Sequence, residues 1–397
     1  MSQDLAVKGF CFSAVESGIR GKKRLDIGLI SCARPAAAAA VYTTSRVKAA
    51  PVLLGIEKIK SGRVQAVMIN SGISNACTGQ EGLDNARESS AMLAEALGIP
   101  KDLVHVSSTG VIGQQLDMQC FATIPDLVIS RSPERLADVA RAIMTTDTVQ
   151  KTAVKELVVG GMPVRIAGIA KGAGMIMPNM ATMLGFILTD ADVAPEVLND
   201  FLKSSVEQSF NRITVDGDTS TNDTLMILAS AEAGTPPITE SGSSEAQVFK
   251  KALDELCLDL ALQIVADGEG ATKLATIKIV NAKNNEDAEQ AARTIANSPL
   301  VKTAFFGQDA NWGRIIAALG RSGAFFDPDK VSISFDTVEL VRNGLWCGAE
   351  AEGSASEILK KKTFEVIVDL QAGSYSALIY TTDFSIDYVK INADYRT

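Results

Sequence analysis

The stretch that decides the fold reads Lys171-Gly-Ala-Gly-Met-Ile-Met-Pro-Asn-Met-Ala-Thr-Met-Leu-Gly-Phe-Ile-Leu-Thr-Asp190, close to the middle of the chain. Its first part contains two glycines, which allow unusual backbone conformations, and Pro178, which prevents a helix there. From Thr182 to Leu188 the residues are almost continuously apolar, which predicts a strand buried on both faces. A bent loop would therefore bring the hydroxyl of Thr182 to the start of a core strand. That place suits a nucleophile, although an ordinary loop-to-strand junction has the same pattern.

The composition is that of a soluble globular protein. The 397 residues are 46% hydrophobic and 21% charged, enough for two or three domains or for one large layered unit. No apolar run approaches the roughly 20 residues that span a bilayer, and the N-terminus lacks the pattern of a secretory signal. The formal net charge of −9 argues against nucleic acid, whose phosphates need a basic face. We expect a soluble cytoplasmic enzyme with no nucleic-acid or membrane partner.

Cysteine and histidine usage narrows the chemistry. The six cysteines are far apart and form no CxxC pattern and no zinc spacing, so we expect reduced thiols and no metal site. The chain has a single histidine, His105, inside an alternating run that is typical of a strand. Histidine is the commonest general base near neutral pH. We favour a structural role for His105, and an enzyme of this composition then needs another base.

The order of helices and strands predicts an α+β fold. Short strands are expected at 9–15, 25–30 and 38–43, a hairpin at 154–159 and 164–170, and a β-α-β passage at 275–280, 287–296 and 301–306. Because helices and strands are mixed without strict alternation, we expect a layered α+β or αββα unit rather than a doubly wound sheet. A smaller α/β portion is expected in the C-terminal half, at roughly 280–350.

Four polar or glycine-rich loops follow strands or helices, at 70–79, 107–113, 171–182 and 267–273. The last lacks the phosphate-binding GxxxxGK[ST] pattern, and no GxGxxG opens a helix after a strand, so no nucleotide cofactor is predicted. The acidic run Asp216–Asp223 lacks the ligand pattern of a calcium loop, and we favour a solvated turn there. The remaining candidate mechanism uses a hydroxyl nucleophile that is activated by a base other than histidine.

An N-terminal nucleophile would solve the missing base. If the chain is cut before Thr182, the new α-amine lies beside the Thr182 hydroxyl, and its pKa of about 7.7–8.0 leaves much of it free to accept a proton. Thr182 follows a small residue, Ala181, in a loop whose strain would favour an acyl shift. Thr109-Gly110 suits an oxyanion hole, because a glycine lets backbone N–H groups approach a substrate closely.

The segment Lys171–Leu184 resembles the self-cleavage motif of the ornithine acetyltransferases, also called bifunctional glutamate N-acetyltransferases of arginine biosynthesis. The resemblance covers essentially the whole chain. Ser45 and Ala310 depart from the residues expected for the family, Asn and Pro. Supporting blocks are Tyr42–Pro51, Asn70–Gly79, Ser107–Gly113, Met144–Thr148, Val215–Asp223, Asp267–Lys273, Asp309–Arg314 and Ile391–Thr397.

The resemblance implies a layered αββα sandwich of the self-processing N-terminal-nucleophile kind. The precursor would cut itself between Ala181 and Thr182 into an α chain, 1–181, and a β chain, 182–397, assembled as α2β2. Thr182 would take the acetyl group from N2-acetyl-L-ornithine and pass it to L-glutamate, a ping-pong cycle that needs no cofactor. Acetyl-CoA as a second donor is left open.

The resemblance also assigns the remaining site residues. Thr109 and Gly110 match the oxyanion-hole positions of the family. Its substrate-binding positions match Thr148, Lys171, Thr182, Glu269, Asn392 and Thr397. The register at Thr148 is open, since Thr145 and Thr146 lie close by, and Asn392 and Thr397 require the C-terminal tail to fold back.

Two other functions stay open from the sequence. A related self-cleaving aminopeptidase or amidase would give the acyl group to water instead of glutamate. An uncleaved binding protein would keep the fold without the chemistry.

Overall fold

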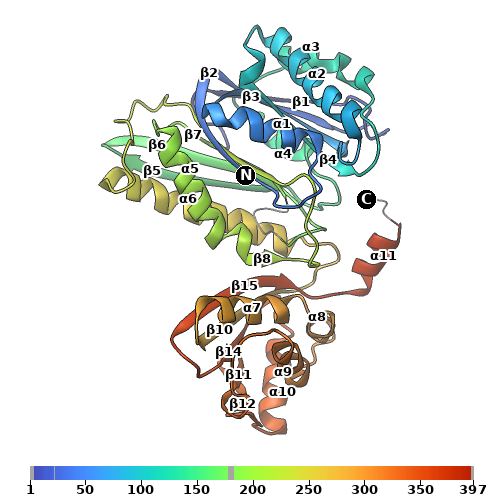
Figure 1. Ribbon diagram of the computed structural model, residues 1–397, viewed down its shortest axis with the longest axis vertical. Helices are drawn as coiled ribbons and strands as arrows, with labels where there is room; N and C mark the ends of the chain where they lie inside the picture. Colours follow the sequence, from blue (N-terminus) through green and yellow to red (C-terminus); the bar gives the residue numbers. More distant parts are fainter. Residues whose placement is uncertain (1–3, 22, 178–182, 395–397) are drawn as a thin grey trace. The chain divides into compact units, whose positions relative to one another are not determined.

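The computed structural model describes residues 4–21, 23–177 and 183–394, which form two compact units (Figure 1). Within these ranges, unit 1 comprises the residues up to Asn211 together with Asp218–Ile264, and unit 2 comprises Arg212–Gly217 and the residues from Val265 onward. The division into chains 1–181 and 182–397 stays a prediction, because Ala181 and Thr182 lie outside the described residues.

Unit 1 is built on an eight-stranded sheet in the order β4-β3-β2-β9-β7-β6-β5, with β1 paired to β2. The long strand β2 has different neighbours along its length: residues 27–32 pair with β1, and residues 37–42 pair with β9. The strands are β1 Phe10–Val15, β2 Ile27–Tyr42, β3 Arg63–Ile73, β4 Val104–Val111, β5 Lys151–Val159, β6 Met162–Lys171, β7 Leu184–Thr189 and β9 Thr224–Ala229.

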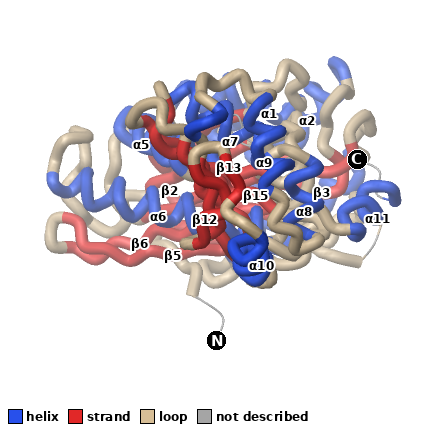
Figure 2. The backbone as a smooth tube through the Cα atoms, turned by 90° about the horizontal axis from the view of Figure 1, so that it is seen from below, coloured by secondary structure: helices blue, strands red, loops and turns tan. Residues whose placement is uncertain are grey.

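The helices of unit 1 are α1 Ala50–Lys58, α2 Gly79–Leu97, α3 Ile124–Ile129, α4 Leu136–Ala142, α5 Pro195–Gln208 and α6 Ser244–Ala266. Helices α1 and α2 cover the outer face of the β1–β4 part, where Leu93 packs with Met68 and Val106. On the other part of the sheet, Figures 1 and 2 show α6 along the β5–β6 hairpin. Gly168 of β6 has no side chain there, and two leucines of α6 occupy the space.

A single apolar core lies between the two parts of the sheet. It joins Phe12 and Ile69 from the β1–β4 part to Phe186 and Leu188 of β7, and Val139 of α4 packs into it. With helices on both outer faces, unit 1 is a layered αββα sandwich, which confirms the predicted fold class.

Unit 2 is a second α/β unit with a seven-stranded sheet in the order β13-β12-β11-β14-β10-β15-β8. Its core joins Ile277 and Val366 of the sheet to the alanine-rich face of α7. The strands are β8 Ile213–Thr214, β10 Leu274–Ala282, β11 Ser332–Phe335, β12 Val338–Arg342, β13 Leu345–Trp346, β14 Thr363–Asp369 and β15 Tyr375–Thr382. The helices are α7 Asn285–Ala296, α8 Pro299–Phe306, α9 Trp312–Gly320, α10 Ala349–Ile358 and α11 Ile386–Asp394.

Most predicted elements are confirmed, and two are wrong. The strands expected at 25–30 and 38–43 are one strand, β2, because the alanine run between them continues the extended backbone. The strand expected at 301–306 is helix α8. Pro299 lies in its first turn, and Val301 and Phe305, four residues apart, are buried on the same face.

All six cysteines are free thiols. Within the described ranges, no helix is both long and apolar enough to cross a membrane.

Candidate active site

The predicted oxyanion-hole residues lie near the end of β4, which runs parallel to β3 and pairs Gly110 with Gly72. Gly110 has a φ of 131°, and a Cβ there would collide with the backbone of Gly72. Any other residue at 110 would therefore be strained and would push β3 away from β4. The close approach explains the glycine, while its role as an oxyanion donor stays a prediction.

Lys171 and Thr109 come together although 62 residues separate them in the sequence. Lys171 ends β6, and its Nζ donates a hydrogen bond to Oγ1 of Thr109 at 3.3 Å. Both residues are nearly buried, with 8% and 9% of their surfaces exposed. A hydroxyl that accepts from an ammonium group still has its own proton to donate. The pair thus combines a buried cation with a directed hydroxyl donor.

Asp147 holds this region together, and the sequence did not single it out. Its carboxylate accepts hydrogen bonds from Lys151 Nζ at 2.5 Å, from Gly172 N at 2.7 Å and from Thr145 N at 2.9 Å. Burial by itself would raise the pKa of Asp147, but the charges of Lys171 and Lys151 and these hydrogen bonds lower it to about 2. Asp147 is therefore a buried anion among cations at neutral pH. Its spacing of four residues from Lys151 was the signal that could have found it.

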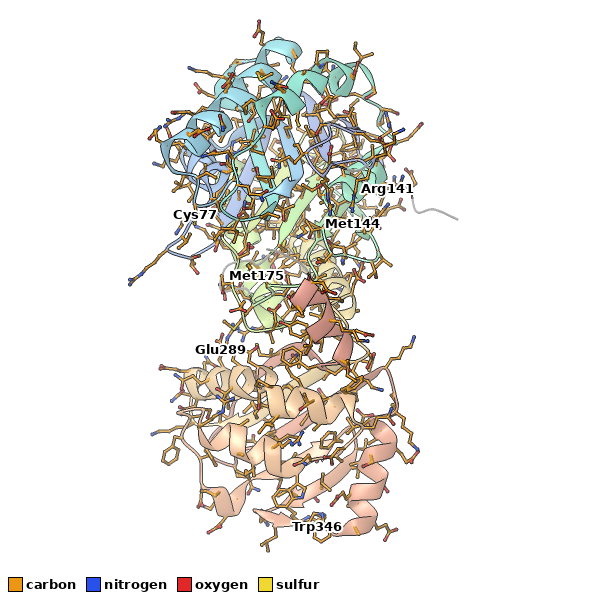
Figure 3. All side chains as sticks on the ribbon, turned by 90° about the vertical axis from the view of Figure 1, so that its right-hand side faces the viewer. Cys77, Arg141, Met144, Met175, Glu289 and Trp346 are labelled. Carbon is orange, nitrogen blue, oxygen red and sulfur yellow. The ribbon has the colours of Figure 1, made fainter. Side chains whose placement is uncertain are left out.

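Thr148 follows Asp147 and is exposed, whereas Thr145 and Thr146 are half-buried. The segment is anchored at Met144, which Figure 3 labels. The Met144 carbonyl accepts hydrogen bonds from Arg20 Nη1 at 2.6 Å and from Arg24 Nη2 at 3.2 Å. Which of the three threonines contacts a substrate stays a prediction.

A second buried carboxyl, Asp223, precedes β9 and is 2% exposed. Burial raises the pKa of Asp223 well above its usual range, and Ser220 and the charge of Lys171 offset only part of that effect. Its Oδ2 atom has no hydrogen-bond partner in the part of the chain that the structure describes. Residues 221–223 are buried, so the expectation of a solvated loop is wrong for the end of the acidic run.

Glu269 and Asn392 belong to unit 2 and meet there. Asn392 Nδ2 donates to Glu269 Oε2 at 2.8 Å, so helix α11 brings this part of the tail to the 267–273 loop. Asp383 fixes that loop by accepting hydrogen bonds from the backbone N–H groups of Thr272 and Lys273, at 2.8 and 2.9 Å. Glu269 is 8% exposed.

Three predicted site residues cannot be placed: Ala181, Thr182 and Thr397 lie outside the described residues. His105 is described, in β4, and is 1% exposed. Burial, with a smaller effect of the Lys58 charge, lowers the pKa of His105 to about 3. A neutral, buried imidazole fits the structural role that we favoured. Among the described residues, no group of three or more His, Cys, Asp or Glu side chains could hold a metal ion.

Comparison with known proteins identifies the family. The model of the ArgJ family matches residues 11–397, nearly the whole chain. The chain belongs to the ArgJ family. It is 52% identical to the arginine biosynthesis bifunctional protein ArgJ of Desulfotalea psychrophila, over 99% of this chain and 100% of that protein. It is 53% identical to the protein of that name from Geobacter sulfurreducens, over 98% of this chain and 100% of that protein.

A solved ArgJ structure, from Bacillus halodurans, is 43% identical and covers 45% of this chain and 95% of its own, with a TM-score of 0.43. Membership of the ArgJ family makes this chain an acyltransferase of arginine biosynthesis.

Proposed function

We propose that the chain transfers the acetyl group of N2-acetyl-L-ornithine to L-glutamate, through an acetyl-enzyme on Thr182. The precursor first cuts itself between Ala181 and Thr182. The observation that supports this most directly is the buried contact of Lys171 with Thr109 beside Gly110, which joins a cation to hydroxyl and backbone donors. Both substrates carry an α-carboxylate, which a buried ammonium attracts. The acetylation of Thr182 and the transfer of the acetyl group to glutamate each pass through an oxyanion.

The chemical steps need no histidine. The α-amine of Thr182 takes the proton of its own hydroxyl as Oγ1 attacks the acetyl carbonyl carbon. The oxyanion of the tetrahedral intermediate accepts hydrogen bonds from the hydroxyl of Thr109 and the N–H of Gly110. The C–N bond to ornithine then breaks, and the departing amine takes the proton. Glutamate's amine attacks the acetyl ester in the second half, which restores the Thr182 hydroxyl.

The other assignments complete the proposal. Thr148, Lys171, Glu269, Asn392 and Thr397 bind the substrates. The two chains of each precursor stay together and pair as α2β2 in the cytoplasm. The word "bifunctional" in the relatives' names favours a second activity, and acetyl-CoA is the donor to test. No cofactor or metal is needed for either half-reaction.

An assay with acetylornithine, with and without glutamate, tests the reaction. Acetylglutamate and ornithine should form together in equal amounts. Acetate release that does not depend on glutamate would instead indicate the aminopeptidase or amidase. Mass spectrometry of the purified protein should show two chains, and Thr182→Ala should stay uncut and inactive. An intact chain with full activity would overturn the mechanism.

A further inference from the structure

The side chain of Asn222 links the segment that follows β3 to strand β4, at the predicted oxyanion hole. Its Nδ2 donates one hydrogen bond to the carbonyl of Ser74, at 2.6 Å, and another to the carbonyl of Ser108, at 2.8 Å. Its Oδ1 accepts from Thr221 Oγ1 at 2.6 Å. Asn222 is 6% exposed, so these bonds form out of contact with bulk water. The family resemblance assigned no role to Asn222.

The carbonyl of Ser108 belongs to the peptide bond that precedes Thr109. A peptide unit is planar and trans, so its C=O and N–H point in opposite directions. Along an extended strand the backbone groups alternate, and the N–H of Gly110 points to the same edge as the C=O of Ser108. Among the described residues no strand pairs with that edge of β4, because β4 ends the sheet order and β3 occupies its other side. Fixing the Ser108 carbonyl therefore also fixes the direction of the Gly110 N–H.

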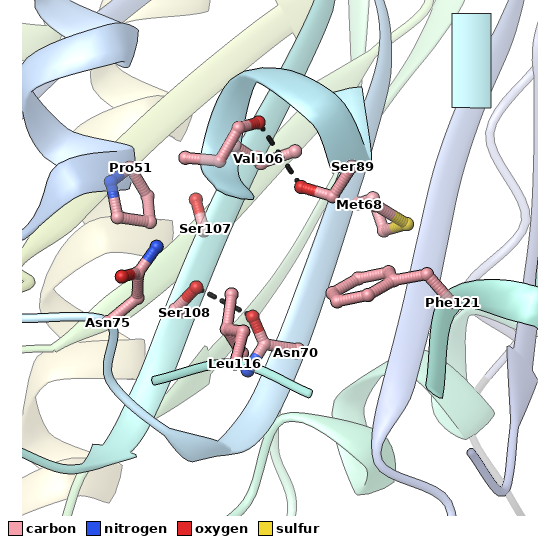
Figure 4. Close-up of a pocket in the computed structure, with 11 residues that line it drawn as sticks. Pro51, Met68, Asn70, Asn75, Ser89, Val106, Ser107, Ser108, Leu116 and Phe121 are labelled. Atoms are coloured by element: carbon pink, nitrogen blue, oxygen red, sulfur yellow. Dashed lines mark hydrogen bonds between the residues drawn. The ribbon is translucent and has the colours of Figure 1, made fainter. Parts of the chain in front are cut away.

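Neighbouring bonds hold the same segment from its other sides. Ser108 Oγ donates to Asn70 Oδ1 at 2.6 Å, next to a cavity of about 10 Å³ behind β4, room for roughly one water (Figure 4). Ser74 donates to the carbonyl of Val111 through both its N, at 3.0 Å, and its Oγ, at 2.8 Å. Hydrogen bonds thus fix both ends of the segment 108–111, and Asn222 provides the hydrogen bond on the edge of β4 that faces away from β3.

Only a side chain with an amide fits these partners. An aspartate would aim a carboxylate at two carbonyl oxygens, and an alanine would leave both carbonyls without this donor. Asn222 also directly precedes Asp223 and β9, and Thr224 of β9 pairs with Leu184 of β7. Asn222 therefore links the β7–β9 pair to β4, the strand that carries Gly110. Thr182 shortly precedes β7 in the sequence.

We propose that Asn222 is a positioning residue for the acetyl transfer: by holding the Ser108 carbonyl, it aims the N–H of Gly110 at the oxyanion of the tetrahedral intermediate. This role rests on the proposed function. An interaction that is realised only in the transition state changes kcat much more than it changes the binding of substrate.

Asn222→Ala tests the role, with Asn199→Ala as the matched control. Asn199 is a half-buried asparagine on α5 whose Nδ2 donates to Oδ1 of its neighbour Asp200 at 3.3 Å. We expect kcat for acetylornithine to fall about 10- to 100-fold in Asn222→Ala, less than for the outright loss of a donor, with KM changed less than about twofold. The melting temperature is measured alongside, and rates are expressed per molecule cleaved at Thr182. Asn199→Ala should keep the wild-type kcat.

A second variant covers the case in which Asn222→Ala does not fold. Asn222→Asp keeps the shape, and its protonated form regains one donor. Protonation of the Thr182 amine lowers kcat in both proteins as the pH falls, so the ratio of the Asn222→Asp kcat to the wild-type kcat should rise as the pH is lowered. A wild-type kcat in either variant would overturn the proposal. So would a loss of activity that only follows the loss of melting temperature, or the failure of both variants to fold. If the wild type itself transfers no acetyl group, the proposed function fails instead.

Discussion

Two deeply buried lysines, one in each unit, are held in different ways. Lys151 of unit 1 lies 2.5 Å from the carboxylate of Asp147, and neither side chain is exposed. Lys302 of unit 2 donates to three neutral oxygens, Thr381 Oγ1 at 2.8 Å and the O and Oγ1 atoms of Thr382 at 2.5 and 3.2 Å. No carboxylate lies within ion-pair distance of Lys302 in the described part of the chain.

The two environments affect the charges of the buried groups differently. Burial lowers the pKa of Lys302 to about 7, even though the charges of Asp383 and Asp216 act in the opposite direction. The lysines around Asp147 instead share a carboxylate whose pKa is about 2. Unit 1 therefore keeps fixed charges beside the proposed site, where a carboxylate substrate would be bound. Unit 2 uses its lysine to join α8 to β15, a task that either protonation state can perform.

The largest effect should come from Asp147→Asn. The variant keeps the shape but removes the charge that compensates buried ammonium groups, so we expect a loss of about 3–5 kcal/mol in the apparent free energy of unfolding. Denaturant unfolding measures it. The acetyl transfer rate should fall as well, since Gly172 and Lys171 lose their common neighbour. A loss below 1 kcal/mol would show that the charges are compensated elsewhere.

Lys302→Met should lower the free energy of unfolding by less than Asp147→Asn does, by about 1–3 kcal/mol. The methionine fills the space without a charge to bury, and the penalty comes from the threonine oxygens that lose a donor. The same denaturant experiment gives the value. If Lys302→Met proves more destabilising than Asp147→Asn, the contrast between the two clusters is wrong.

The two clusters should also respond to different ranges of pH. The pKa of Lys302 is lower in the folded protein, about 7, than its ordinary value of 10.5, so between these values the unfolded chain binds the extra proton. Stability then falls as the pH is lowered through this range, by at most about 1.4 kcal/mol per pH unit. The Asp147 contribution is present above its ordinary pKa of 3.8 and is lost as the pH falls towards about 2.

Unfolding curves of the wild type and Lys302→Met, measured from pH 7 to pH 10, give the first of these terms by subtraction. The difference between the two proteins should depend on pH in that range. A constant difference would mean that Lys302 keeps one protonation state throughout.

The smallest effect is expected at the surface. Lys360 and Glu357 form an ion pair at 2.5 Å, but 57% and 69% of their side chains are exposed. Water screens such a pair, and Lys360→Ala should cost less than about 1 kcal/mol. The variant sets the lower end of the scale on which the two buried lysines are compared, and a cost equal to that of Lys302→Met would remove the distinction between them.

The sequence predicted the elements whose pattern is local. The hairpin of β5 and β6 and the buried strand β7 follow from apolar periodicity and from the Gly160-Gly161 turn. The helix α8 could not be predicted in the same way, because a short apolar run has no clear period. Its Pro299 was the missed signal.

The site was predictable only in part. Thr109, Gly110 and Lys171 came from motifs, but their contact depends on strands far apart in the sequence. Asp147 and Asn222 were missed because their role lies in what their side chains reach: Gly172 and Lys151 for one, the carbonyls of Ser74 and Ser108 for the other. Polar residues in a loop carry no pattern that distinguishes such bonds from contact with water.

In the proposed reaction Thr182 carries the acetyl group, and the intact mass of the chain that begins at Thr182 shows whether it does. After mixing with acetylornithine alone, that chain should gain the mass of one acetyl group, located on Thr182 by fragmentation. Addition of glutamate should remove the group and yield acetylglutamate. An enzyme that transfers acetyl groups without this adduct, or that carries the acetyl group on another residue, would contradict the account.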